Sequence, residues 1–337
     1  MDQTAPLVSI VMSAYNEAAF ISETIDSLLQ QSYKNFELII VDDASTDNTA
    51  DVIRKYENNR IILLRNKENK RLAFNLNLGI QKAHGKYIAR MDADDICMPD
   101  RLVKQVNYLE QHPEIAIVGG AAQEFGGANA LLEYPENHEE IKVMLLFENA
   151  MCHPAVMFRN DPTIFKYDID CKASQDYELW SRLIWKVKFA NLSDVVVKYR
   201  IHQNQTKHVL GKEQKAGAIK ARNYLLSRLL DGPTHEDTEL FYSACNYHAP
   251  KSENELIAIE NLFEQLLKRN REKGLFQEEL LENRIQEQFI RDCYASIRYG
   301  TGSFKVLKKS KYYPAYKMKP LSFRLKMQIY RLFPKRR

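Results

Sequence analysis

The sequence has few cysteines and no motif that would pair them. Five cysteines are scattered over 337 residues, and none belongs to a Cys-x-x-Cys pair. An odd, scattered set argues against a disulfide framework, and the missing pairs argue against a zinc ribbon. We therefore expect free thiols in a reducing compartment, which favours a cytoplasmic protein.

Long apolar runs are also missing. No stretch approaches the roughly 20 apolar residues that a membrane-spanning helix needs. The N-terminal part offers only a short apolar run over residues 7–12, whereas a signal peptide needs a basic start and a longer apolar core. We expect a chain that stays inside the cell, either free or resting on the inner face of the cell membrane.

Glycine-rich phosphate loops are the third absence. No Gly-x-Gly-x-x-Gly follows a predicted strand, and no Walker lysine loop occurs. Dehydrogenases and P-loop nucleotide hydrolases therefore lose their main support. A bound diphosphate would have to be held by a metal ion and basic side chains.

Acidic residues are absent from the end of the sequence. Residues 303–337 hold 12 Lys and Arg and no Asp or Glu, although the formal net charge of the chain is only +4. Aromatic residues lie among these cations, and an anionic lipid surface attracts this composition. We predict that this basic tail contacts a membrane surface. A solvated helical end that packs on the body is the second possibility. Nucleic-acid binding is the third, but no nucleic-acid module appears, so we expect no such partner.

Apolar patterning over the first 120 residues alternates between strands and helices. Strands are predicted at 7–12, 36–41, 61–64 and 87–91, and helices at 18–31, 49–56, 72–84 (ended by Gly85) and 99–112. This alternation is typical of an α/β fold with a mostly parallel sheet and helices on both faces.

The rest of the chain changes character near residue 210. Short strands at 115–118, 155–158 and 195–199 lie among helices at 139–147 and 175–185, and longer helices follow at about 212–230, 253–271 and 277–298. We predict an α/β domain over 1–210, with halves 1–120 and 121–210. A helical region over 211–302 and the basic tail over 303–337 complete the chain.

Ligands of an open parallel sheet bind beyond the carboxyl ends of its strands. The mostly polar residues 13–17 follow the first predicted strand, Asp42 and Asp43 follow the second, and Arg71 leads into the third helix. A carboxylate such as Asp42 or Asp43 can accept hydrogen bonds from a base or a ribose. The alternative, which can hold at the same time, is that these residues shape the turn and cap the next helix.

Asp92, Asp94 and Asp95 form an acidic cluster directly after the fourth predicted strand. Three carboxylates on four residues repel one another unless a cation joins them. Hard oxygen ligands suit Mg²⁺ or Mn²⁺ bridging to phosphate oxygens, and such a metal neutralises a departing diphosphate. A strand-end turn with helix capping is the alternative.

Five segments combine these residues in a recognisable order: VSIVMSAYNE (8–17), ELIIVDDASTD (37–47), YIARMDADDI (87–96), MPDR (98–101) and YRIHQNQ (199–205). Together they resemble family 2 glycosyltransferases of GT-A fold, over about residues 6–208. The resemblance implies inverting transfer of a sugar from a UDP-sugar to a saccharide acceptor, including a lipid-linked one, with Mn²⁺ or Mg²⁺ as cofactor. The halves 1–120 and 121–210 would then bind the nucleotide-sugar and the acceptor.

The resemblance also assigns site residues by position. It implies nucleotide-sugar contacts at Ser13, Tyr15, Glu17, Asp42, Asp43, Arg71, Asp92 and Asp94, metal ligands at Asp94, Asp95 and His202, and acceptor contacts at His153 and Gln175. Two positions depart from the family pattern: many relatives have glycine at position 71, and Gln175 replaces the usual Glu. His202 and His153 could equally be structural histidines.

Asp176 keeps the position of the family's catalytic base. A sugar hydroxyl is a weak nucleophile at neutral pH, so a carboxylate on the acceptor side must take its proton as the new bond forms. A helix N-terminal acid favoured by the helix dipole is the alternative role. The Gln-x-x-Arg-Trp motif of processive members is missing, which favours transfer of a single sugar.

The donor and the overall activity leave alternatives open. Residues 87–99 and 196–205 are especially similar to bacterial lipooligosaccharide β-1,3-N-acetylglucosaminyltransferases. This resemblance favours UDP-GlcNAc as the donor and implies a role in bacterial surface polysaccharide or lipooligosaccharide synthesis. UDP-Gal, UDP-GalNAc and UDP-Glc are the other candidate donors. A non-catalytic nucleotide-sugar-binding subunit and a nucleotidyltransferase are the alternative classes, and the latter would need a glycine-rich loop after the first strand.

Overall fold

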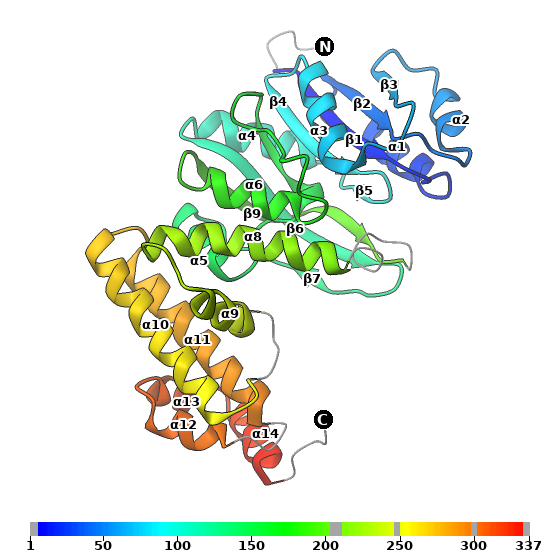
Figure 1. Ribbon diagram of the computed structural model, residues 1–337. Coiled ribbons are helices and arrows are strands. Elements are labelled where there is room, and N and C mark those ends of the chain that lie inside the picture. Colours follow the sequence, from blue (N-terminus) through cyan, green and yellow to red (C-terminus); the bar gives the residue numbers. More distant parts are fainter. Residues whose placement is uncertain (1–5, 203–210, 246–249, 298–301, 333–337) are drawn as a thin grey trace. The chain divides into compact units, whose positions relative to one another are not determined.

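One mixed sheet organises the N-terminal part of the protein (Figure 1). The computed structural model describes residues 6–202, 211–245, 250–297 and 302–332, with side chains as far as residue 327. Four parallel strands lie in the order β3 (Ile61–Arg65), β2 (Phe36–Asp42), β1 (Val8–Ala14) and β4 (Tyr87–Asp92). The sheet continues with β8 (Met157–Arg159), β6 (Ile115–Phe125), β9 (Lys188–Arg200) and β5 (Ile96–Cys97), while β7 (Leu131–Leu132) pairs with β6. Of these, β9 runs parallel to β6, and the other pairings are antiparallel.

Helices cover both faces of the sheet, as the alternating pattern predicts. α1 (Ile21–Leu29), α2 (Thr49–Arg54) and α4 (Arg101–Gln111) share one core with alternate residues of β1. α3 (Arg71–Lys82) packs on the opposite face, where a Cβ on Gly79 would lie 2.4 Å from Cγ1 of Val11. The predicted fold class, a mostly parallel α/β sheet followed by a helical C-terminal region, is confirmed.

Several predicted boundaries differ from the structure, among them the strand predicted at 195–199, which spans Lys188–Arg200. Three further differences have a clear physical reason. The strand predicted to end at residue 118 continues to Phe125, because β9 pairs with it along most of its length. A 3₁₀ turn over His153–Ala155 replaces the start of the strand predicted at 155–158. The third helix ends at Lys82, before Gly85. Gly85 is instead required by close packing, since its Cβ would lie 2.5 Å from the Ser9 nitrogen.

The chain divides into two compact units. The first contains the sheet and comprises Met1–Ile141 and Asn149–Ala221, and the second comprises Lys142–Glu148 and Arg222–Arg337. Helix α6 (Gln175–Leu183) lies in the first unit, whereas α5 (His138–Phe147) and α8 (Gly211–Leu229) have residues in both. The boundary predicted near residue 210 stays a prediction.

All regular secondary structure in the described part of the second unit is helical. Its helices are α9 (His235–Cys245), α10 (Glu253–Lys273), α11 (Glu278–Ile297), α12 (Ser303–Lys309), α13 (Tyr313–Met318) and α14 (Leu321–Leu332). The basic tail therefore begins with folded helices whose aromatic residues pack inward, as Tyr312 does against Phe289. None of the described helices combines the length and the apolarity that crossing a bilayer requires.

Candidate active site

The carboxyl ends of the central strands bring the first group of predicted residues to one edge of the sheet. In the parallel register, Ser13 of β1 lies beside Asp92 of β4 and beside Val41 of β2. Asp42 lies beside Ala14 one residue further along. The strand-end rule thus places three separate segments of the sequence at a common site.

Polar side chains tie the two turns after β1 and β2 together. The backbone nitrogen of Asn16 donates to Ser45 Oγ at 3.0 Å, and Asn16 Oδ1 accepts from the Thr46 nitrogen at 2.8 Å. Asn16 and Ala44 both adopt left-handed backbone conformations, with φ of 57° and 59°. Because such conformations are unfavourable for residues with a Cβ, the surrounding bonds must hold them. Tyr15 projects from this braced turn into solvent.

Asp43 organises the entrance to α3. Its Oδ1 accepts from the Asn66 amide at 2.8 Å and from the Lys70 nitrogen at 2.7 Å, and its Oδ2 accepts from the Arg71 nitrogen at 2.8 Å. Arg71 has a φ of 69° and begins the helix. The turn-shaping role is therefore visible in the structure, and contact of Asp43 or Arg71 with a nucleotide stays a prediction.

Asp42 and Ser13 also make internal contacts. Asp42 is fully buried, and its Oδ2 lies 2.9 Å from Nε of Arg65 on β3. Ser13 Oγ accepts from the Asn75 amide at 3.0 Å, and Asn75 Oδ1 accepts from Asn66 at 2.7 Å. Ser13 and Asp43 are thus linked through two asparagines that the sequence reasoning missed.

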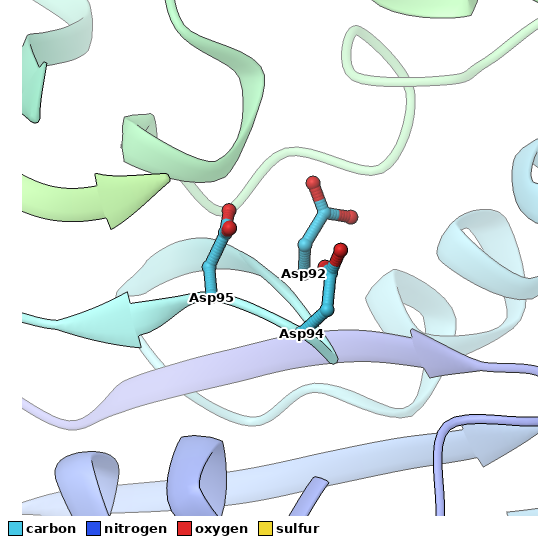
Figure 2. Close-up of side chains that lie close together, drawn as sticks. All are labelled: Asp92, Asp94 and Asp95. Carbon is cyan, nitrogen blue, oxygen red and sulfur yellow. The ribbon is translucent and has the colours of Figure 1, made fainter. Parts of the chain in front are cut away.

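The acidic cluster has the geometry of a cation site (Figure 2). One carboxylate oxygen each from Asp92, Asp94 and Asp95 lies within 4.8 Å of the others. Asp95 is fully buried; its Oδ1 accepts from the Arg200 nitrogen at 2.8 Å, while none of the described residues donates to its Oδ2. Burial raises the pKa of Asp95 well above its usual range, and the charges of Asp92 and Asp94 raise it further. A buried oxygen without a donor, beside two further carboxylates, fits a divalent cation.

His202 joins this cluster from the segment that follows β9. Its Nε2 lies 2.9 Å from Asp94 Oδ2, and its ring lies 5.0 Å from that of Phe20. Imidazole nitrogen is a ligand that Mn²⁺ accepts beside carboxylates. The structure thus brings the three predicted metal ligands together. Residues 203–205 of the same segment lie outside the described residues.

Asp92 is held differently from its two neighbours. Arg90 donates to both of its carboxylate oxygens: Nη1 to Oδ2 at 2.5 Å, and Nη2 to Oδ1. Arg90 and Asp92 are two residues apart on β4, so their side chains emerge on the same face of the strand. Burial chiefly raises the pKa of Asp92, Arg90 lowers it, and the charges of Asp94 and Asp176 raise it. The two-residue spacing of Arg90 and Asp92 at the end of a predicted strand would have indicated this pair from the sequence alone, but Arg90 was not among the predicted site residues.

Glu17 and Arg200 complete the surroundings of the cluster. Burial raises the pKa of Glu17 to about 8, and the charges of Asp94 and Asp92 add to the rise. Arg200 donates from Nε to the Asp94 carbonyl at 2.7 Å, and its guanidinium lies over the Phe20 ring at 4.7 Å. Arg200 therefore fixes the turn that carries Asp94 and Asp95.

Asp176 lies in the first turn of α6. Its Oδ2 accepts from the Asn149 amide at 2.6 Å. Burial raises the pKa of Asp176, while bonds from the Tyr177 nitrogen and from Asn149 oppose the rise. The charge of Asp176 also contributes to the raised pKa of Asp92, after burial and the charge of Asp94, so the two carboxylates interact electrostatically.

The turn before Asp176 is strained and supported by α8. Ser174 has a φ of 57°, and its Oγ donates to the Gln214 carbonyl at 3.1 Å. A Cβ on Gly217 would lie only 2.1 Å from the Ala173 oxygen. The first half of α8 therefore packs directly against the backbone that presents Asp176.

The two predicted acceptor residues make contacts inside the protein. His153 Nε2 lies 2.7 Å from the Tyr167 hydroxyl, and burial lowers the pKa of His153 well below its usual range, so the ring is neutral. Gln175 is buried and donates to the Lys172 carbonyl at 3.3 Å. Acceptor contact by either residue stays a prediction.

Comparison with known sequences identifies the protein family to which the chain is similar. Residues 9–164 match the family model described as Glycosyl transferase family 2. An uncharacterized glycosyltransferase of Haemophilus influenzae is 34% identical over 238 residues, which cover 65% of this chain and 73% of that protein. The O-antigen biosynthesis glycosyltransferase WbnJ of Escherichia coli is 30% identical, over 73% of this chain and 96% of that protein. The UDP-Glc:α-D-GlcNAc-diphosphoundecaprenol β-1,3-glucosyltransferase WfaP of Escherichia coli is 31% identical, over 71% and 93%.

Solved structures support the fold. TarS 1–349 of Staphylococcus aureus in complex with UDP-GlcNAc has a TM-score of 0.56 at 15% identity, covering 86% of this chain and 90% of that one. The mannosyltransferase PcManGT of Pyrobaculum calidifontis, in complex with GDP-Man and Mn²⁺, has a TM-score of 0.53 at 16% identity, covering 97% and 87%. With the sequence matches, these show that the chain belongs to glycosyl transferase family 2 and is a glycosyltransferase of GT-A fold.

Proposed function

We propose that this glycosyltransferase moves one sugar from a UDP-sugar to a hydroxyl group of a saccharide, with inversion at the anomeric carbon. The observation that carries the proposal is the presence of two acidic centres whose charges interact: the cluster of Asp92, Asp94 and Asp95, and the half-buried Asp176. One centre suits a diphosphate with its cation, and the other suits a base on the opposite side of the reacting carbon.

Asp176 takes the proton of the acceptor hydroxyl in this mechanism. The acceptor oxygen then forms a bond to the anomeric carbon while the bond from that carbon to the diphosphate oxygen breaks. The electron pair leaves with UDP, and the configuration inverts because attack and departure occur on opposite faces. The Asn149 amide holds Asp176 in place and favours its charged form.

The acidic cluster would serve the leaving group. Asp94, Asp95 and His202 would hold Mn²⁺ or Mg²⁺, which neutralises diphosphate charge when bound. Arg90 holds Asp92 in place, so that Asp92 would contact the sugar or ribose. Arg200 keeps the turn of Asp94 and Asp95 in place. Tyr15, exposed at the end of β1, would stack on the base, with Ser13, Asp43, Glu17 and Arg71 around it.

The donor and the acceptor are proposed at the level of class. WfaP is named for UDP-Glc and the TarS complex for UDP-GlcNAc, so a UDP-hexose is the donor class, and UDP-GlcNAc is our first candidate within it. The O-antigen relative WbnJ supports a saccharide acceptor of a bacterial surface polysaccharide or lipopolysaccharide. A lipooligosaccharide acceptor, which the resemblance of residues 87–99 and 196–205 favours, is one member of this class.

A donor screen tests the proposal. Full-length protein with Mn²⁺ is incubated with UDP-, GDP- and dTDP-sugars, and both slow donor hydrolysis and thermal shift are measured. We expect one or a few UDP-sugars to be hydrolysed, with the effect lost in EDTA. A preference for GDP- or dTDP-sugars, or hydrolysis that EDTA leaves unchanged, would contradict the proposed donor and metal.

A further inference from the structure

Exposed apolar side chains gather at one place in the helical unit. Eight large apolar side chains are exposed among the described residues, and three of them, Met318, Leu321 and Leu325, fall within eight consecutive positions. Their exposed fractions are 87%, 62% and 52%. Leu321 and Leu325 are four residues apart on α14, so they project from the same side of that helix. We call Met318, Leu321 and Leu325 the apolar tip.

The apolar tip is not part of an unfinished core. The same segment already buries Phe304, Leu307, Tyr316 and Met327 within its own unit. Phe323, between Leu321 and Leu325, packs against Tyr294 of α11 with the ring centroids 5.0 Å apart. The helices α12–α14 are therefore anchored to their unit, and the tip is the apolar surface that remains outside.

The sequence around the apolar tip is rich in Lys and Arg and contains no acidic residue. Residues 302–327 include eight Lys and Arg and no Asp or Glu. Two of the eight pair with acids of other helices: Lys311 with Glu264 at 2.6 Å and Lys319 with Glu287 at 3.4 Å. Others lie exposed, among them Lys317 and Lys326, which flank the tip directly. Apolar side chains ringed by exposed cations match a surface that is negatively charged outside and apolar beneath.

We infer that the apolar tip docks on the surface of a bilayer that contains anionic phospholipids, with Met318, Leu321 and Leu325 inserted among the acyl chains. The flanking ammonium groups would contact the lipid phosphates. Nucleic acid would satisfy the cations but would offer nothing to three exposed aliphatic side chains. A protein partner would need an acidic rim around an apolar pocket, whereas an anionic bilayer presents both properties over its entire surface.

Vesicle binding by the full chain tests the inference. Flotation with phosphatidylcholine vesicles is compared with flotation on vesicles that also contain phosphatidylglycerol, at low and high salt. Met318→Ser, Leu321→Ser and Leu325→Ser together remove the tip. Leu131→Ser, Ile169→Ser and Ile257→Ser remove an equal number of exposed apolar side chains elsewhere and serve as the control.

We expect binding to anionic vesicles only, weakened more than about tenfold by the tip variant and not by its control. Lys317→Glu with Lys326→Glu should weaken binding similarly, while Lys55→Glu with Lys82→Glu, exposed in the other unit, should not. Equal binding by tip variant and control would overturn the inference, as would a chain that binds a DNA duplex but no anionic vesicle. Donor hydrolysis, measured in parallel, separates this result from the proposed reaction.

Discussion

Nε2 of His202 lies 2.9 Å from Oδ2 of Asp94, which precedes it by 108 residues. The contact joins the segment after β9 to the turn after β4, next to Asp95, whose Oδ2 has no donor among the described residues. We predict that Asp95→Ala lowers the Mn²⁺-dependent affinity for UDP by more than about tenfold. Calorimetric titration of UDP with and without Mn²⁺ measures this, with the exposed Asp100→Ala as control. Unchanged affinity in Asp95→Ala would contradict the metal site.

Asn149 tunes the proposed base. Because its amide donates to Asp176 Oδ2, it stabilises the charged carboxylate and opposes the rise in the pKa of Asp176 that burial causes. Transfer needs the charged form, so the rate should fall as the pH falls through this raised pKa. We predict that Asn149→Ala raises the pKa further and moves the acidic limb of kcat/KM to higher pH. Asn129→Ala, at an exposed position, should leave the pH profile of kcat/KM unchanged. An unchanged acidic limb in Asn149→Ala would refute the proposed role of Asn149.

Gly217 permits the close packing of α8 against the turn before Asp176. Alanine normally stabilises a helix interior relative to glycine, but here its Cβ would lie 2.1 Å from the Ala173 oxygen. We predict that Gly217→Ala destabilises the protein by about 1–3 kcal/mol and lowers kcat more than it weakens UDP binding. The control is Gly211→Ala, since no described atom lies within 4 Å of that Cβ. A Gly217→Ala protein as stable and active as the control would show that this contact does not support the base.

Asp292 is a buried acid of the helical unit with an unusual charge state. Its Oδ2 has no donor among the described residues, and burial raises its pKa well above the usual range. The folded state therefore binds more protons than the unfolded state at pH values above the unfolded pKa of about 3.9, and stability falls as the pH rises through that window. We predict that Asp292→Asn raises the melting temperature at pH 8 and much less at pH 4. Calorimetry at the two pH values tests this, with the exposed Glu279→Gln as control.

The sequence allowed prediction of the sheet and its strand-end residues because both follow local rules. Apolar period and strand order place Ser13, Asp42 and Asp92 at one edge of the sheet. The contacts that fix the site join distant segments, and no local pattern encodes them. Arg200 reaches Asp95 across 105 residues.

Other parts of the site escaped prediction for related reasons. Asn149 lies 27 residues before Asp176, in a stretch without a regular pattern. The left-handed conformations of Ala44 and Ser174 are held by surrounding structure rather than favoured by the residues themselves. The backbone preferences of these two residues therefore do not predict their left-handed conformations.

The most direct test of the account is the Asp176→Asn variant. Asparagine keeps the shape of the side chain and its place beside Asn149 but cannot take a proton. UDP affinity in the presence of Mn²⁺ and sugar transfer to a saccharide acceptor are measured together, with the exposed Asp170→Asn as the matched control. We predict unchanged UDP affinity, with sugar transfer reduced at least about a hundredfold. Normal turnover by Asp176→Asn would contradict the assignment of the base and with it the proposed mechanism.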